Sequence, residues 1–168
     1  MEAISIDASI VITERSRRTW WRRISEGAVR RINDDGRGRA MLSWDDVLPH
    51  ICIPMTPEDI AFVLRADAGD AEAQTDIGQL FSIAGKYEAA LYWLQQGAQQ
   101  GNRDAMQWLG RCYLSGEGVP KDDNLGIMWI AKAASHGHVI ATFQMNAIFP
   151  QGVADSNGAT GYSEMPAA

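Results

Sequence analysis

The 168-residue sequence has only two cysteines, Cys52 and Cys112, and no apolar run of the length that spans a bilayer. A transmembrane helix needs about 20 mostly apolar residues in succession. Two cysteines do not make the disulfide framework of a small secreted domain. The first residues include acidic side chains and no basic segment ahead of an apolar run, so a secretory signal is not expected. We therefore expect a cytoplasmic protein with reduced thiols and no membrane partner.

Patterns that perform catalysis or bind a metal are also missing. Cys112, His136 and His138 lack the paired spacing of a zinc site, and we expect them in a helix core and a loop. His50 and Cys52 resemble half of a nucleophile pair, but the sequence places no Asp or Asn to orient the histidine. A phosphate-binding loop would need Gly-Lys followed by Ser or Thr, which does not occur. We expect no catalytic, cofactor-binding or metal site, and hence no enzyme.

Charge is distributed unevenly along a chain whose formal net charge is −6. The first fifty residues contain nine Arg and eight acidic residues, whereas the remainder contain six basic and thirteen acidic residues. All nine Arg lie between 15 and 39. A local basic surface of this size has three interpretations: a solvated helix face, a docking surface for an acidic partner or the acidic repeats, or a phosphate-binding surface.

One pattern of small and aromatic residues occurs twice in full between residues 69 and 148 and begins a third time. Equivalent alanines stand at Ala73, Ala105 and Ala141, which are 32 and 36 residues apart. Periods of this length are typical of stacked helical pairs. Within each unit the apolar residues recur three and four positions apart, the spacing of one face of a helix. The pattern therefore predicts a solenoid with five repeat helices.

Small and aromatic residues at matching positions predict how the two helices of a unit pack. Gly78 and Gly110 lie inside the apolar stripe of the first helix. An interior helical glycine costs about 1 kcal/mol relative to alanine, so we expect a neighbouring helix to approach closely there. Trp93 and Trp129 occupy the same position in the second helices. We expect both to be buried, and truncation of Trp129 to alanine to cost roughly 3–5 kcal/mol.

The second unit resembles a nearly complete Sel-one-like repeat, a family related to the tetratricopeptide-like helical-pair solenoids. The resemblance is carried by Ala105, Leu109, Gly110, Tyr113, Gly116, Gly118, Val119, Trp129, Lys132, Ala133, Ala134 and Gly137. The first unit, with its tight turn at 84–86, looks more like an ordinary tetratricopeptide repeat. The third unit departs from the pattern, because Asn146 replaces the glycine and Pro150 ends the segment before a second helix. The resemblance implies an all-α superhelical solenoid of about two and a half repeats.

The segments around this solenoid divide the chain into three parts. We expect an arm and helical cap at 1–68, the repeats at 69–149, and a disordered tail of small and polar residues at 150–168. The cap is predicted to contain a short strand or extended arm at 4–12 and helices at 14–33, 41–48 and 57–67. The fold should be all-α from about 14 to 148, with the cap packed on the first repeat through Trp20, Ile24 and Val63.

The resemblance also implies a function as a protein-interaction adaptor, because helical-pair solenoids bind peptides or helices in a concave groove. First-helix residues between the stripe positions would line that groove: Glu72, Thr75, Gln79, Gln107, Arg111 and Phe143. Two basic residues of the 14–33 helix, Arg22 and Arg23, would contact an acidic partner. The protein's own arm or tail is the alternative occupant of the groove.

Two further interpretations concern the ends of the chain. The third unit has no second helix to cover Ile140, Phe143 and Ile148, so a second copy, giving a homodimer, or a different protein could cover them. A function of another class is a nucleic-acid-binding regulator, in which the three cap helices form a helix-turn-helix-like unit. Pro49 and Pro54 make the turn between the last two cap helices longer than usual, which disfavours nucleic acid as the partner.

Overall fold

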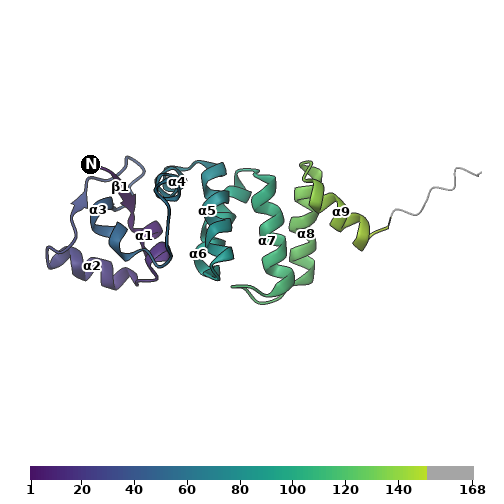
Figure 1. The fold of residues 1–168 in the computed structure, drawn as a ribbon, viewed down its shortest axis with the longest axis horizontal. Helices are drawn as coiled ribbons and strands as arrows, with labels where there is room; N and C mark the ends of the chain where they lie inside the picture. The colour runs from purple at the N-terminus through teal and green to yellow at the C-terminus, as the bar shows by residue number, and fades with distance from the viewer. Residues whose placement is uncertain (151–168) are drawn as a thin grey trace, which may run out of the picture.

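The computed structural model describes residues 1–150 and is elongated, with a small N-terminal unit at one end and helix α9 (Val139–Ile148) at the other (Figure 1). Between these ends, helices lie side by side across the long axis. The described chain is mostly helical, as the repeats predict. The tail expected at 150–168 lies outside the described residues apart from Pro150.

Three short strands form an antiparallel sheet in the N-terminal unit. Strands β1 (Ala3–Ser5), β2 (Arg31–Ile32) and β3 (Met41–Ser43) lie in the order β1-β3-β2. Leu42 in the central strand is paired with Ile4 on one side and with Arg31 on the other. The expectation of an all-α fold from residue 14 is therefore wrong for this unit, where two of the strands replace predicted helix.

The first helices of this unit also differ from the prediction. Helix α1 (Ile6–Thr13) occupies most of the segment expected to be extended, and the Ser5 hydroxyl caps it by accepting a hydrogen bond from the Ala8 N–H. Helix α2 (Arg17–Ser25) ends well before residue 33, because the chain turns at Gly27, whose φ is 73°. Helix α3 (Trp44–Val47) is a single turn that continues into a 3₁₀ turn at Leu48–His50.

Helix α4 (Pro57–Ala68) begins where the sequence predicts. The Thr56 hydroxyl accepts a hydrogen bond from the Asp59 N–H, and the Asp59 carboxylate accepts one from the Thr56 N–H. The helix ends at Gly69, which stands 32 residues before the repeat glycine Gly101. Helix α4 therefore takes the place that a second helix would have in a preceding repeat, and it packs on α5 (Ala71–Ile83).

The five predicted repeat helices are present. They are α5, α6 (Tyr87–Gln99), α7 (Arg103–Ser115), α8 (Asp123–Ser135) and α9. The three first helices, α5, α7 and α9, begin at equivalent caps: Asp70, Asn102 and His138 each accept a hydrogen bond from a backbone N–H of the first turn. The repeat thus extends to the residues that start each helix.

The close approach predicted at the two helical glycines is confirmed. A Cβ atom added to Gly78 would lie 2.6 Å from Cγ of Leu94 in α6. A Cβ atom added to Gly110 would lie 2.5 Å from Cδ1 of Ile130 in α8. Leu94 and Ile130 occupy the same repeat position, 36 residues apart, and both are fully buried. Each helical pair is therefore fitted together by a glycine facing an aliphatic side chain.

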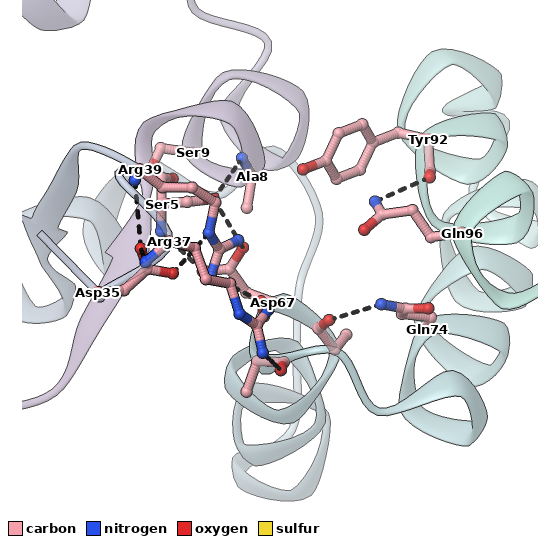
Figure 2. Close-up of polar contacts among 12 residues, drawn as sticks. Ser5, Ala8, Ser9, Asp35, Arg37, Arg39, Asp67, Gln74, Tyr92 and Gln96 are labelled. Carbon is pink, nitrogen blue, oxygen red and sulfur yellow. Dashed lines mark hydrogen bonds and ion pairs between the residues drawn. The ribbon is translucent and has the colours of Figure 1, made fainter. Parts of the chain in front are cut away.

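A buried carboxylate joins the N-terminal unit to α4 (Figure 2). Asp67 accepts hydrogen bonds from the Ser5 backbone N–H at 2.7 Å and from the Ser5 hydroxyl at 2.6 Å. Arg39 donates to the same carboxylate at 2.8 Å and to Asp35 at 2.7 Å. These charge-assisted bonds connect β1, the loop before β3 and the end of α4, so the cap is fastened to the helix that carries the repeats.

The cap contacts the repeats through α4, as expected, and also through α1; α4 carries Val63, which is fully buried. Helix α1 lies against α6 and α4 lies against α5, whereas α2 packs on α1, so Trp20 and Ile24 belong to the N-terminal unit itself. Trp93 in α6 is fully buried, but Trp129 in α8 is half-buried beneath Lys132. Helix α6 has the additional neighbour α1, which α8 lacks, so the equal burial expected for the two tryptophans is wrong.

Candidate functional site

The exposed side of the first helices forms a continuous surface along the stack. Helices α5 and α7 contact each other more than α6 and α8 do, so the first helices lie on the inside of the curve. Their accessible side chains recur at the spacing of one helix face. We call this surface the inner face; it consists of Glu72, Asp76, Gln79 and Ile83 from α5 and Asp104, Trp108, Arg111 and Ser115 from α7.

Three of the six predicted groove residues lie on the inner face, and three, Thr75, Gln107 and Phe143, do not. Glu72 and Arg111 are exposed and Gln79 is half-buried. Thr75 is only 2% exposed, and its hydroxyl donates to the Ala71 carbonyl at 2.8 Å. Gln107 is 5% exposed, and its side-chain amide donates to Gln144 at 3.3 Å. Placing Thr75 and Gln107 on the accessible surface was wrong, because Thr75 packs against Gly97 of α6 and Gln107 reaches Gln144 of α9.

Phe143 lies at the same repeat position as these two buried residues but is 72% exposed. No further first helix follows α9 within residues 1–150, so nothing in that part of the chain covers the ring. Phe143 therefore belongs to a separate surface, which we call the apolar end. It consists of Val139, Ile140, Phe143, Ile148 and Phe149, and includes the three residues expected to be uncovered.

Carboxylates gather at one end of the inner face and shift the pKa of Asp76. Burial raises the pKa of that carboxyl, and the neighbouring charges of Glu72 and Asp104 raise it further. The pKa of Asp70 is lowered instead, chiefly because its carboxylate accepts the Ala73 N–H and also pairs with Arg65. Glu72, Asp76 and Asp104 therefore repel one another on the inner face, and a bound cation would reduce that repulsion.

An aromatic ring and a guanidinium occupy the middle of the same face. The guanidinium carbon of Arg111 lies 4.5 Å from the ring centroid of Trp108, the geometry of a cation–π contact. A matching pair lies on the second helix of the same repeat, where Lys132 Nζ is 4.8 Å from the Trp129 ring. The Trp108–Arg111 pair offers both an apolar plane and donors for a carboxylate.

Sequence reasoning missed Asp76, Asp104 and Trp108 as residues of this surface. The signal was available in the repeat spacing: Glu72 and Asp104 are 32 residues apart, as are Asp76 and Trp108. The 32-residue spacing relates exposed positions of α5 and α7 as well as apolar ones. Comparing the exposed positions in this way identifies the residues of the inner face.

The two arginines predicted to contact an acidic partner differ in accessibility. Arg22 is exposed, with Nε 3.9 Å from a Glu26 oxygen. Arg23 instead lies 3.0 Å from Nε2 of His50, and Arg15 lies 3.4 Å from Nδ1 of the same ring. Of the two residues predicted to contact an acidic partner, only Arg22 is fully accessible.

The helix-turn-helix-like unit predicted from segments 14–33, 41–48 and 57–67 does not form with those bounds; the two helices joined by a three-residue turn are instead α1 and α2. The predicted helix at 41–48 is instead strand β3, the single turn α3 and the start of the 3₁₀ turn. One helical turn between a strand and a 3₁₀ segment does not make the two-helix unit that enters a DNA groove. The two-helix unit predicted between residues 41 and 67 is therefore not present in residues 1–150.

The two thiols and His50 lie in surroundings that shift their pKa. Burial raises the pKa of Cys52 and raises that of Cys112 to about 11, so both thiols stay protonated near neutral pH. Burial and the charges of Arg15 and Arg23 lower the pKa of His50. Within residues 1–150, no three or more His, Cys, Asp or Glu side chains converge as a metal site would require.

No helix in the described part of the chain is both long enough and apolar enough to span a bilayer.

Two segments match a known repeat family. Residues 71–102 and 103–138 each match the family model described as Sel1 repeat. The matches coincide with the pairs α5–α6 and α7–α8, so the resemblance seen in the second unit is confirmed. The first unit, which looked more like an ordinary tetratricopeptide repeat, matches the Sel1 repeat model as well. Helix α9 lies beyond both matches.

A solved structure agrees with this assignment. The fold is similar to the crystal structure of a Sel1 repeat protein from Oxalobacter formigenes, with a TM-score of 0.52 and 26% sequence identity. The similarity covers 57% of this chain and 29% of that chain, so this chain spans less than a third of the solved protein's length. No curated protein sequence matches the chain.

Proposed function

We propose that this chain, whose residues 71–138 are two Sel1 repeats, is a non-enzymatic interaction module that holds a segment of a partner protein on its inner face. Sel1 repeats are generally protein-protein interaction modules. The observation that carries the proposal is the row of accessible, helically spaced side chains shared by α5 and α7, with the Trp108–Arg111 pair at its centre. Tryptophan and arginine are the residue types most enriched among interface residues of high binding energy.

The charges of the inner face indicate the chemistry of the bound segment. Glu72, Asp76 and Asp104 would accept a Lys or Arg, which also relieves the repulsion that raises the pKa of Asp76. Arg111 would donate to a carboxylate or a backbone carbonyl of the same segment. We therefore propose a segment with a basic residue toward the start of α5 and α7 and an aromatic or acidic residue over Trp108. An acidic partner reaching Arg22 remains a second, separate contact.

The size of the face sets the strength of binding. Two adjacent helices of 13 residues are each about 20 Å long and about 10 Å apart, enough for two or three turns of a helix or a short extended strand. Such a contact falls at the low end of interface areas, which is typical of transient association. We expect reversible binding that is weakened by salt, because the carboxylates are exposed.

Affinity capture with matched variants tests this proposal. The full-length protein, Arg111→Glu and Lys132→Glu would each be used to capture proteins from a cell extract, with quantitative mass spectrometry of what is retained. Both substitutions reverse a charge and remove a cation from a tryptophan ring, one on the inner helix α7 and the other on α8. We expect a protein that is retained by the wild type and by Lys132→Glu and is lost with Arg111→Glu. Equal retention by all three proteins, or loss only with Lys132→Glu, would contradict the proposal.

A further inference from the structure

Beyond this function, we propose that the apolar end pairs with the apolar end of a second copy of this chain, forming a two-fold dimer through α9. This inference concerns α9 rather than α5 and α7 and does not depend on what binds to the inner face, although Ile140 stands at the repeat position of Glu72 and Asp104. It starts from the exposure of Val139, Ile140 and Phe143, which are 67%, 59% and 72% exposed. A cluster of exposed large apolar side chains on one helix marks an interface.

The repeat pattern itself excludes the simplest cover for α9. In the two preceding units the glycine at this position allows the second helix to approach, and a Cβ atom there would lie within 2.6 Å of Leu94 or Ile130. In α9 the same position is Asn146. The Asn146 side chain would clash with a second helix placed as α6 is on α5 or as α8 is on α7. Within residues 1–150 the array ends at α9, and the outer side of that helix is suited to a differently placed neighbour.

The absence of charged residues from α9 itself favours a second copy, although Asp104 and Arg103 of α7 contact His138 and Gly137 just before the helix. From Ala133 to Ala154 the sequence contains no Asp, Glu, Lys or Arg. A charged partner finds no complementary group on α9, since charge complementarity acts only where charges face each other. Two copies of a protein with a net charge of −6 can nevertheless meet here without placing like charges opposite one another.

The order of side chains along α9 is self-complementary. Val139, Phe143 and Ala147 are four residues apart and lie on one strip of the helix, with Ile140 beside it. In an antiparallel pair centred on Phe143, Val139 faces the partner's Ala147, so a larger side chain meets a smaller one. A two-fold contact requires the same patch on both subunits, and this strip meets that requirement.

The area of the apolar end is that of a weak dimer. Exposed side chains of Val, Ile and Phe offer roughly 60–120 Å² each to a partner, so the five residues supply about 500 Å² per copy. The total of about 1,000 Å² stands at the lower limit for a specific interface. We therefore expect a dimer that dissociates on dilution.

Sedimentation equilibrium of the purified full-length protein tests this inference without any other partner. Over a range from about 5 to 500 µM, mass action should raise the average mass from that of one chain toward that of two. Phe143→Asp should remain a monomer at every concentration, with an unchanged circular dichroism spectrum because the ring is exposed. Ile83→Asp is the matched control, since Ile83 is 77% exposed on α5 and far from α9 in the stack; it should dimerise like the wild type.

A wild type that stays monomeric at the highest concentration would overturn the dimer, and cover by residues beyond 150 or by another protein would then be the explanation. A dimer that survives Phe143→Asp or is lost with Ile83→Asp would place the contact elsewhere. The antiparallel arrangement has its own test: Phe143→Cys should form a disulfide between two copies on mild oxidation, whereas Ile83→Cys should not. Failure of both outcomes leaves the proposed inner-face function untouched, because that function is tested by capture of a different protein.

Discussion

Gly110 of α7 and Gly126 of α8 face each other so closely that a Cβ atom added to either would lie 3.0 Å from the carbonyl oxygen of the other. The two helices of the second repeat therefore meet backbone to backbone at this point. In the first repeat the equivalent residues are Gly78 and Ala90. The pairing of small residues across the two helices is what allows each repeat to be a thin layer, and thus allows α5 and α7 to be neighbours on the inner face.

Gly110→Ala should therefore destabilise the protein despite alanine's better helix propensity. The new methyl group would meet Ile130, which can shift, and the Gly126 carbonyl, which cannot shift without moving α8. Overpacking costs about 1–3 kcal/mol and the gain in propensity is about 1 kcal/mol, so we expect a net loss of roughly 1 kcal/mol. Urea unfolding followed by circular dichroism measures it, with the exposed Asn124→Ala as control. A Gly110→Ala variant more stable than the wild type would show that the helices have room to separate.

Asp67→Asn should loosen the cap from the repeats. The substitution keeps the shape of the side chain but removes the charge that accepts hydrogen bonds from Ser5 and Arg39 (Figure 2). Breaking a buried, charge-assisted network costs roughly 2–4 kcal/mol. The control is Asp123→Asn, because the Asp123–Lys121 pair is exposed and should contribute less than about 1 kcal/mol. Similar urea midpoints for the two variants would mean that Asp67 does not fasten the cap.

Trp93→Ala and Trp129→Ala should differ in cost although they occupy the same repeat position. Trp93 is fully buried, so its truncation should cost roughly 3–5 kcal/mol, whereas the half-buried Trp129 should cost about half as much. Chemical unfolding of the two variants under identical conditions makes the comparison. Equal losses would indicate that α1 adds nothing to the packing of α6.

Asp76→Asn should stabilise the protein at neutral pH. The folded-state pKa of Asp76 is raised by burial and by Glu72 and Asp104, so the native chain holds this proton more tightly than the unfolded chain. The contribution of Asp76 to stability therefore falls as pH rises through and above about 4, its ordinary pKa. We expect a higher melting temperature than the wild type at pH 7 and no difference at pH 3, where the carboxyl is protonated.

Asp70→Asn should have the opposite effect on the melting temperature, because the pKa of Asp70 is lowered rather than raised. The pKa of Asp70 is lowered by the Ala73 N–H and by Arg65, so its charge stabilises the fold at neutral pH and that stability is lost on acidification. Its substitution should lower the melting temperature at pH 7. If Asp76→Asn also lowered it, the crowding of carboxylates on the inner face would not be unfavourable, and the case for a cationic contact there would fail.

The repeats were predictable because their signals are local and occur more than once. Gly78 and Gly110 each marked a helix contact, and the 32-residue spacing of Ala73 and Ala105 aligned the helices before any contact was known. The strands of the N-terminal unit were not predictable in this way. Strands β1 and β3 are distant in sequence, and each is defined by its pairing with the other, as of Ile4 with Leu42. The helical spacing of apolar residues in the arginine-rich segment 14–33 does not indicate which strands pair.

The surface was harder to predict than the fold. Thr75 and Gln107 stand between the positions of the apolar stripe, which suggested exposure, but both are buried against other helices, at Gly97 and Gln144. The position of Phe143 in the repeat was identified correctly, yet its exposure depends on the lack of a following first helix in the described chain. Hydrogen-bond partners and neighbouring helices are properties of the assembled stack, so a single stretch of sequence does not specify them.

The measurement that tests the central claim most directly is photo-crosslinking of the partner from defined positions. A photoreactive phenylalanine analogue would replace Glu72, which is exposed on the inner face, or Gln95, which is exposed on α6. Both positions lie in the first repeat, so they differ in the face they present rather than in their place along the stack. We predict that the partner retained by the wild type is crosslinked from position 72 and not from position 95. Crosslinking from position 95 alone, or equally from both, would contradict binding on the inner face.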